Sequence, residues 1–230
     1  MTQSVALPGG PTLVIREWGR PDGAVILLLH GLTSSGDSWR HVAPLLGKRF
    51  RVVAVDLRGH GGSSRSTDYS FETMRNDIIR LLDALGFLAV IAIGHSMGGL
   101  VAYLLAATRP DLVRALVLEE VPPPDPANPP HQVPRRSSPD DTCDWRAVSQ
   151  VLRWRNNPPQ EWWQLAQRIA CPTLVVGATQ SHLSQDRMAE LARRIPHGQF
   201  VSVEGEHDLH TLRPGEFDAA VEPFLTPWAR

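Results

Sequence analysis

The sequence predicts an α/β fold in which a mostly parallel sheet is covered by helices on both faces. Several apolar runs are rich in β-branched residues and show no alternation with polar ones, as at residues 24–30, 51–56 and 90–93. Strands with this pattern are buried on both sides. Helical spacing of apolar residues separates such runs, most clearly at residues 71–85, which end before Gly86. Strands that alternate with helices form parallel sheets wrapped by helices.

The expected elements keep this alternation along most of the chain. Strands are expected at residues 12–18, 24–30, 51–56, 90–93, 113–118, 171–177 and 199–203. Helices are expected at residues 39–46, 71–85, 97–108, 183–195 and 216–225. A stretch with two glycines and a proline, residues 19–23, separates the first two strands. This spacing predicts that they form a hairpin at the edge of the sheet.

Length and charge limit the classes of function. A chain of 230 residues with a net charge of −1 fits one large domain with a modest insertion, and gives no reason to expect a nucleic-acid or membrane partner. No signal-peptide pattern or membrane-length apolar run is visible. Cys143 and Cys171 are expected to be reduced thiols in a cytoplasmic protein. We expect no metal and no cofactor, and a monomer or homodimer.

The segment 121–168 breaks the alternation of strands and helices. It holds ten of the twenty prolines and four of the seven tryptophans. One interpretation is a structureless surface insertion, because prolines such as those at 122–126 fit neither sheet nor helix. The preferred interpretation is a small cap with helices at residues 144–154 and 160–169, because exposed tryptophans are costly. The sequence thus predicts a core domain of residues 1–120 and 169–230 and a cap of residues 121–168.

One motif carries the chemistry. The pentapeptide Gly94-His95-Ser96-Met97-Gly98 follows an apolar strand and precedes a helical run. This context is typical of the sharp turn that holds a serine hydroxyl exposed for nucleophilic attack. The alternative, a buried serine at a helix start, does not explain the two glycines, which allow close backbone contacts in such a turn.

Three further motifs stand at strand ends in the order of one known family. They are His30-Gly31, the stretch Asp56-Leu57-Arg58-Gly59-His60-Gly61, and Gly205-Glu206-His207-Asp208. With the serine motif, they make the chain resemble an α/β-hydrolase-fold serine hydrolase, of the type of small bacterial esterases and lactonases. The resemblance covers residues 12–120 and 170–228.

The resemblance implies a role for each motif. Ser96 would be the nucleophile and His207 the general base, with His210 as the rival base. The oxyanion would be bound by the backbone N–H groups of Leu32 and Met97. Side chains at the remaining motif positions are expected to fix loops, and these are His30, His60, His95 and Asp56.

The acid departs from the usual pattern of the family. Most members place an aspartate in the loop after the strand expected at 171–177, where this chain has Gln180. Relatives such as the zearalenone lactonases place it after the preceding strand, where this chain has Glu119 and Glu120. Neighbouring side chains at a strand end point to opposite faces, so only one glutamate can turn toward the histidine. We expect Glu120, with Glu119 and Asp186 as alternatives.

These residues predict a serine hydrolase that cleaves a carboxylic ester or lactone of a small-to-medium apolar substrate through an acyl-enzyme. Gly31 and the cap tryptophans are expected at the substrate, and these are Trp145, Trp154, Trp162 and Trp163. A dehalogenase or epoxide hydrolase of this fold would have aspartate in place of Ser96. Two alternatives stay open: a thioesterase or acyltransferase of secondary metabolism, and a ligand-binding or signalling protein with little turnover.

Overall fold

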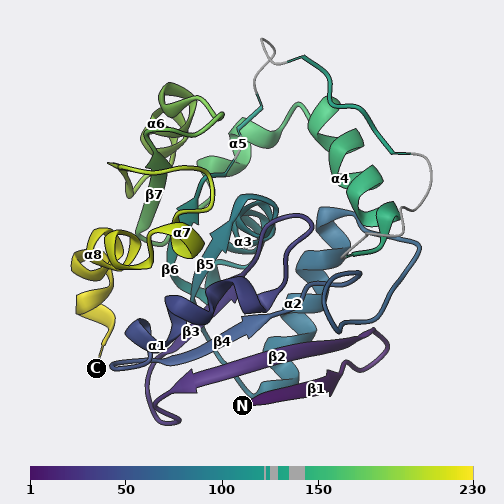
Figure 1. Cartoon of the computed structure of the whole chain (residues 1–230), viewed down its shortest axis with the longest axis vertical. Helices are drawn as coiled ribbons and strands as arrows, with labels where there is room; N and C mark the ends of the chain where they lie inside the picture. Colours follow the sequence, from purple (N-terminus) through teal and green to yellow (C-terminus); the bar gives the residue numbers. More distant parts are fainter. Residues whose placement is uncertain (122, 125–128, 135–142, 230) are drawn as a thin grey trace.

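The computed structural model describes residues 1–121, 123–124, 129–134 and 143–229, and its described strands form one mixed sheet at the centre of the molecule (Figure 1). The strands are β1 (Thr2–Ala6), β2 (Thr12–Gly19), β3 (Val25–Leu29), β4 (Arg51–Val55), β5 (Val90–His95), β6 (Val113–Glu119), β7 (Thr173–Ala178) and β8 (Gly198–Val203). Their order is β1-β2-β4-β3-β5-β6-β7-β8. The pairs from β4 to β8 are all parallel. The predicted fold class is confirmed.

Side chains on the central strands alternate between two apolar cores, one on each face of the sheet. Leu27 and Leu29 of β3 belong to one core, whereas Ile26 and Leu28 belong to the other. Because all four side chains are fully buried, the continuous apolar run is the pattern expected of a strand covered on both faces.

Helices cover both faces. The described α-helices are α1 (Ala43–Leu46), α2 (Phe71–Leu85), α3 (Ser96–Thr108), α4 (Trp145–Asn156), α5 (Trp162–Ala166), α6 (Gln185–Arg194), α7 (Leu209–Leu212) and α8 (Pro214–Leu225). Short 3₁₀ helices are η1 (Gly36–His41), η2 (Pro110–Leu112) and η3 (Thr226–Trp228). Apolar residues of α2, α3 and α6 fill one core, and those of α1 and α8 fill the other. Among the described residues, none of the helices is both long and apolar enough to cross a membrane.

The ends of α2 are those that the sequence predicts. Ser70 caps the first turn by accepting a hydrogen bond from the backbone N–H of Thr73, and Gly86 ends the helix in a left-handed conformation with φ of 70°. The four-residue helix α7 was not predicted, because one turn is too short to show a helical period.

The predicted hairpin of residues 12–18 and 24–30 is wrong. Strand β2 pairs antiparallel with β1 on one side and with β4 on the other, and β3 lies inside the sheet between β4 and β5. A strand that is apolar on both faces is buried best at an interior position. The connection from β2 to β3 therefore passes β4. It is tightly packed there, because a Cβ on Gly19 would lie 2.2 Å from the carbonyl oxygen of Phe50.

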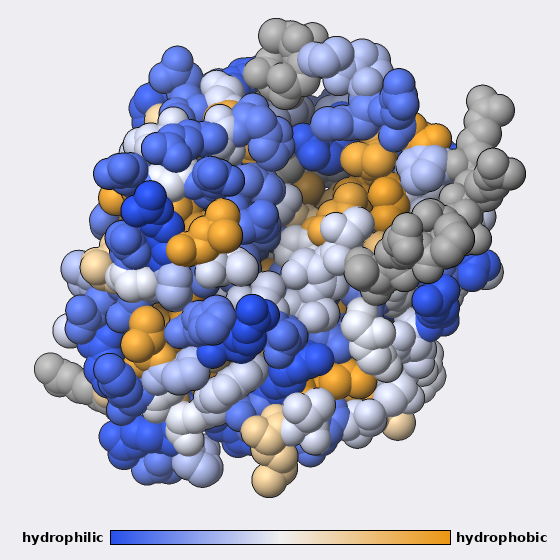
Figure 2. Space-filling view, viewed as in Figure 1, coloured by the Kyte–Doolittle hydropathy of each residue, from blue (hydrophilic) through white to orange (hydrophobic). Residues whose placement is uncertain are grey.

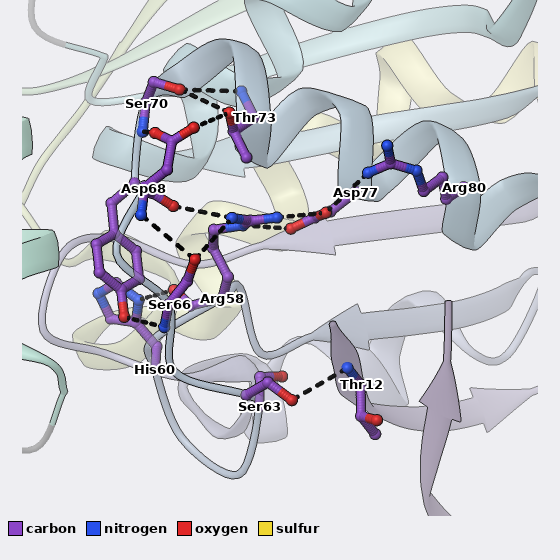
Figure 3. A network of polar contacts seen from close by, with 12 residues as sticks. Thr12, Arg58, His60, Ser63, Ser66, Asp68, Ser70, Thr73, Asp77 and Arg80 are labelled. Carbon is purple, nitrogen blue, oxygen red and sulfur yellow. Dashed lines mark hydrogen bonds and ion pairs between the residues drawn. The ribbon is translucent and has the colours of Figure 1, made fainter. Parts of the chain in front are cut away.

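The loop after β4 is tied to α2 by a buried ion pair (Figure 3). The guanidinium of Arg58 donates through Nη2 to Asp77 Oδ1 at 2.7 Å, and through Nη1 to the carbonyl oxygen of Asp68 at 2.8 Å. A buried ion pair is costly to break on one side, because the remaining charge stays desolvated. This contact holds the loop that passes beneath the start of α4.

Helices α4 and α5 belong to the segment 121–168. Helix α4 is fastened to the core by Tyr69, whose hydroxyl donates to Asp144 Oδ2 at 2.7 Å and whose backbone N–H donates to Gln150 Oε1 at 2.8 Å. Helix α5 packs on α3 and α6. The two helices lie at the same side of the sheet in Figure 1. Much of the proline-rich stretch of the predicted cap lies outside the described residues, and the boundaries 121 and 168 stay a prediction.

Gly98 allows the turn before α3 to pack against β3, and this gives a stability prediction. A Cβ there would lie 2.4 Å from the carbonyl oxygen of Leu29 and 2.5 Å from that of His30. We expect Gly98→Ala to lower the free energy of unfolding by about 1–3 kcal/mol or more, because the overpacked backbones must separate. Urea unfolding measures this.

The matched control is Gly215→Ala. Gly215 is exposed in the first turn of α8, and a Cβ there would have no atom within 4 Å. Alanine favours a helix over glycine by up to about 1 kcal/mol, so this variant should be at least as stable as the parent. Equal stabilities of the two variants would contradict the packing argument.

Candidate active site

Ser96 lies at the junction of β5 and α3 in a strained conformation. Its φ is 50°, in the left-handed region that residues other than glycine seldom occupy. Two close approaches fix the turn: a Cβ on Gly94 would lie 2.6 Å from the carbonyl oxygen of Gly98, and one on Gly31 would lie 2.6 Å from Nδ1 of His95, the residue before Ser96. The loop after β3 therefore lies directly beside the serine.

Glu120 and His207 form a hydrogen-bonded pair. Glu120 follows β6, and its Oε2 lies 2.9 Å from His207 Nδ1. The backbone N–H of Ala178 donates to Oε1 at 2.6 Å, and the hydroxyl of Ser181 donates to Oε2. Glu120 is fully buried, whereas the His207 side chain keeps 23% exposure. A carboxylate accepts hydrogen bonds only, so these donors hold it in one orientation toward the ring.

Glu119 points to the other face of the sheet, as its place next to Glu120 requires. Its Oε2 lies 2.8 Å from His210 Nδ1, and its Oε1 accepts the backbone N–H of His210 at 2.9 Å. Burial raises the pKa of Glu119 to about 7 and lowers that of His210 to about 3. Asp186 is exposed in the first turn of α6. Neither alternative acid contacts His207.

His210, the rival base, lies in the core and not at the cavity that Ser96 lines. Its side chain is 1% exposed and stacks on Trp39 with 3.9 Å between the ring centroids. Helix α7 places it in the core, facing Glu119. The sequence offered no sign of this, because the helix is a single turn and Trp39 is remote in the chain.

The position where most of the family has its acid is used for backbone contacts. Gln180 donates its backbone N–H to the carbonyl oxygen of Gly205 at 2.8 Å, which ties the loop after β7 to the loop that carries His207. The next residue, Ser181, supplies the hydroxyl that holds Glu120. Ser181 was not predicted from the sequence, because one serine in a loop gives no pattern that could reveal it.

The histidines expected to fix loops do so. His30 Nε2 accepts the backbone N–H of Leu57 at 3.0 Å, and His95 Nε2 lies 3.0 Å from the carbonyl oxygen of His207. His60 Nδ1 lies 3.0 Å from the carbonyl oxygen of Arg58. These bonds connect the loops after β3, β4 and β8 around Ser96.

Asp56 pins the loop that it begins, as predicted. Its Oδ1 accepts hydrogen bonds from the backbone N–H of Gly36 at 2.7 Å and from Arg16 Nη1 at 2.6 Å. Its Oδ2 accepts the backbone N–H of Gly62 at 2.9 Å. The carboxylate thus fastens both loops on this side of the serine.

Ser96 and His207 line one cavity of about 760 Å³. Leu32 also lines it, so the loop expected to bind an oxyanion borders the same space; Met97 is 2% exposed beneath the turn. The rest of the lining is mostly polar and includes Ser34, Ser35, Asp37, Ser38, Arg40, Arg155, His182, Asp208 and Thr211. The apolar side chains of Met97 and Leu100 do not line this cavity, because both are buried in the core.

The cap tryptophans divide between two roles. Trp154 and Trp163 line a second cavity of about 650 Å³ beside α4 and α5. Figure 2 shows the molecule hollowed in this region, with apolar side chains gathered at the edge. Trp162 stacks on Tyr103 in the core, and Trp145 lines neither of these cavities. Their expected contact with substrate therefore stays a prediction for Trp154 and Trp163 and is not supported for the other two.

One group of described residues has the composition of a metal site. Atoms of His95, Glu119 and His210 that could act as ligands lie within 4.8 Å of one another. Glu119 is already hydrogen-bonded to the ring and the backbone of His210, and the group is buried against Trp39. We interpret it as a structural pair that anchors the start of α7.

Comparisons with known proteins identify the family of the fold. A family model described as alpha/beta hydrolase fold matches residues 24–147. The mouse sn-1-specific diacylglycerol lipase ABHD11 is 43% identical over 100 residues, which are 43% of this chain and 33% of that protein. Mouse Epoxide hydrolase 4 is 37% identical over 111 residues, 47% of this chain and 30% of that protein. The matched part of the chain thus spans about a third of these curated relatives.

A solved structure matches over the full length. An esterase from Thermogutta terrifontis, described as thermophilic, has a TM-score of 0.84 with 24% identity over 100% of both chains. At this identity the likeness concerns the fold.

The buried histidines predict loss of stability in acid. Burial lowers the pKa of His30 and His95 to about 3. The unfolded chain takes up protons below the ordinary histidine pKa of 6.5, whereas the folded state keeps both rings neutral. The stability they contribute is therefore complete above pH 6.5 and is lost as the pH falls toward 3. We expect the free energy of unfolding to fall by about 1.4 kcal/mol per pH unit for each histidine.

Urea unfolding between pH 7.5 and 5 measures this slope. His41 is exposed, and a His41→Gln variant should keep the slope of the parent. A free energy of unfolding that stays constant from pH 7 to pH 5 would contradict the assignment of neutral rings.

Proposed function

The chain belongs to the alpha/beta hydrolase family, and we propose that it is a serine hydrolase that cleaves a carboxylic ester or lactone through an acyl-enzyme on Ser96. The observation that carries the proposal is the hydrogen bond between Glu120 and His207 in the wall of the cavity that Ser96 also lines. A serine in the strained turn, a histidine and a buried carboxylate are the three groups that acyl transfer to water requires.

The proposed mechanism assigns one task to each group. With Nδ1–H donated to Glu120, His207 has Nε2 available to take the proton of the Ser96 hydroxyl. Ser96 Oγ attacks the carbonyl carbon, and the backbone N–H groups of Leu32 and Met97 are the proposed donors to the oxyanion. His207 then protonates the leaving alcohol. Water repeats the sequence on the acyl-enzyme, and the acid is released.

A nucleophilic serine favours ester chemistry over the reactions of other family members. Dehalogenases and epoxide hydrolases of this fold have aspartate at the position of Ser96. The polar side chains in the lining of the cavity favour a substrate that also carries polar groups, in contrast to the apolar substrate that the sequence predicts. We therefore propose a small ester or lactone as the substrate.

The first prediction concerns the nucleophile. We expect the purified protein to hydrolyse short 4-nitrophenyl esters, and Ser96→Ala to abolish this turnover, because no other group is proposed to form the acyl-enzyme. Release of nitrophenolate measures the rate, and mass spectrometry of the protein with a fluorophosphonate should show one adduct on Ser96. Equal rates with both proteins would overturn the proposal and favour the ligand-binding alternative.

A second prediction concerns the acid. Glu120→Gln should lower kcat by about two to four orders of magnitude, because an amide can neither stabilise the imidazolium nor hold the same ring tautomer. KM should change little. Cooperative thermal unfolding of the variant separates this effect from misfolding.

Asp186→Asn is the matched control, since Asp186 is exposed in the first turn of α6 and makes no hydrogen bond with His207. It should leave kcat within about twofold of the parent, as surface substitutions generally do. A large loss of kcat in Asp186→Asn with little loss in Glu120→Gln would show that the acid has been assigned wrongly.

A further inference from the structure

Arg155 borders both the cavity that Ser96 lines and the cavity beside α4 and α5. It lies in the last turn of α4, and its side chain lines the space that holds Ser96 and His207 as well as the space that holds Trp154 and Trp163. A cation at this point faces whatever substrate reaches Ser96. Arg155 belongs to none of the sequence motifs and has no part in the proposed mechanism.

The guanidinium has no anionic partner within the described part of the chain. Arg40, the other arginine at the Ser96 cavity, is paired with Asp37 at 3.2 Å. Arg187, at the second cavity, is paired with Glu190 at 2.8 Å. Arg155 makes no ion pair or hydrogen bond with the described residues. Burial lowers the pKa of its guanidinium, as expected for a cation that has lost water. A partly buried cation without a partner costs free energy, which a bound anion would offset.

The histidines near Arg155 supply no negative charge that could balance it. Burial and then the charge of Arg155 lower the pKa of His131, and burial, the charge of His207 and then that of Arg155 lower the pKa of His182. The ring of His182 lies tilted against that of His207, with 4.7 Å between the ring centroids. Neither carboxylate of the lining pairs with Arg155, since Asp37 pairs with Arg40 and the side chain of Asp208 is 57% exposed and makes no contact with the guanidinium.

A purely structural role does not account for the position of Arg155. A cation in the last turn of a helix stabilises the helix dipole, but the exposed Arg153 in the same turn supplies that effect without loss of hydration. The helix is also held in place, by the contacts of Asp144 and Gln150 with Tyr69 and by the packing of Trp154 on Phe71 at 4.7 Å. Arg155 is therefore presented from a fixed element.

We propose that Arg155 binds a carboxylate of the substrate, so that the enzyme acts on an ester or lactone that carries a free carboxylate away from the scissile bond. The inference rests on the proposed function of Ser96. The planar guanidinium fork matches a carboxylate through two parallel hydrogen bonds. A single unpaired cation balances one negative charge, which favours a carboxylate over a phosphate dianion in a cavity that also holds Asp37 and Asp208.

The test compares two substrates that differ in one charge. Mono-4-nitrophenyl glutarate carries the carboxylate, and its methyl ester is the neutral analogue. We expect Arg155→Gln to lower kcat/KM for the acid by about 10- to 100-fold, as loss of a charged hydrogen bond does, and to change that for the methyl ester less than threefold. Arg155→Lys should recover part of the loss. Arg153→Gln, on the same helix turn, should leave kcat/KM unchanged for both substrates.

A uniform effect of Arg155→Gln on both substrates, or no effect on either, would overturn the inference while leaving the proposed function intact. If the parent hydrolyses neither substrate, the proposed function fails, and binding then decides the role of Arg155. Calorimetric titration of Ser96→Ala with monobenzyl glutarate should show binding that Ser96→Ala/Arg155→Gln weakens by about tenfold or more. Equal affinities, or preference for phenyl phosphate over monobenzyl glutarate, would overturn the inference.

Discussion

The hydrogen bond between Glu120 and His207 is the contact on which the rest of the proposed site depends. It joins the end of β6 to the loop after β8, and Glu120 also accepts from Ala178 and Ser181 in the loop after β7. In this position the backbone of Glu120 is strained, with a φ of 49°. Strained backbone persists only where surrounding contacts fix it. The other non-glycine residues described with positive φ, Thr33 and Ser96, lie at the same edge of the sheet.

Adjacent glutamates anchor the histidine loop from two sides. Glu120 binds His207 toward the cavity, and Glu119 binds the ring and backbone of His210 toward the core. Alternation of side chains at a strand end produces this division without any further element. Burial separates the two pairs by function: the ring of His207 stays open to the cavity, whereas that of His210 is enclosed by Trp39. Only the first pair can exchange protons with a substrate.

Patterns that arise from neighbouring residues could be predicted from the sequence. The apolar runs revealed the interior strands, and the choice of Glu120 followed from Gln180 together with the alternation of Glu119 and Glu120. Features set by contacts between distant segments could not be predicted. The pairing of β2 with β4, the burial of His210 against Trp39 and the hydroxyl of Ser181 on Glu120 all depend on how remote loops meet. The predicted apolar substrate is not matched by an apolar cavity lining, because apolar residues of the motifs, such as Met97, fill the core.

The core and the segment 121–168 contribute different parts of the proposed reaction. Ser96, Glu120 and His207 all follow the carboxyl ends of core strands, where short connections and close backbone contacts fix their geometry. Arg155 comes from α4, whose attachment through Asp144 and Tyr69 is separate from those loops. Binding energy at a remote charge can orient the reacting carbonyl without taking part in bond making. A change of residues on α4 could therefore alter the preferred substrate while the chemistry at Ser96 stays the same.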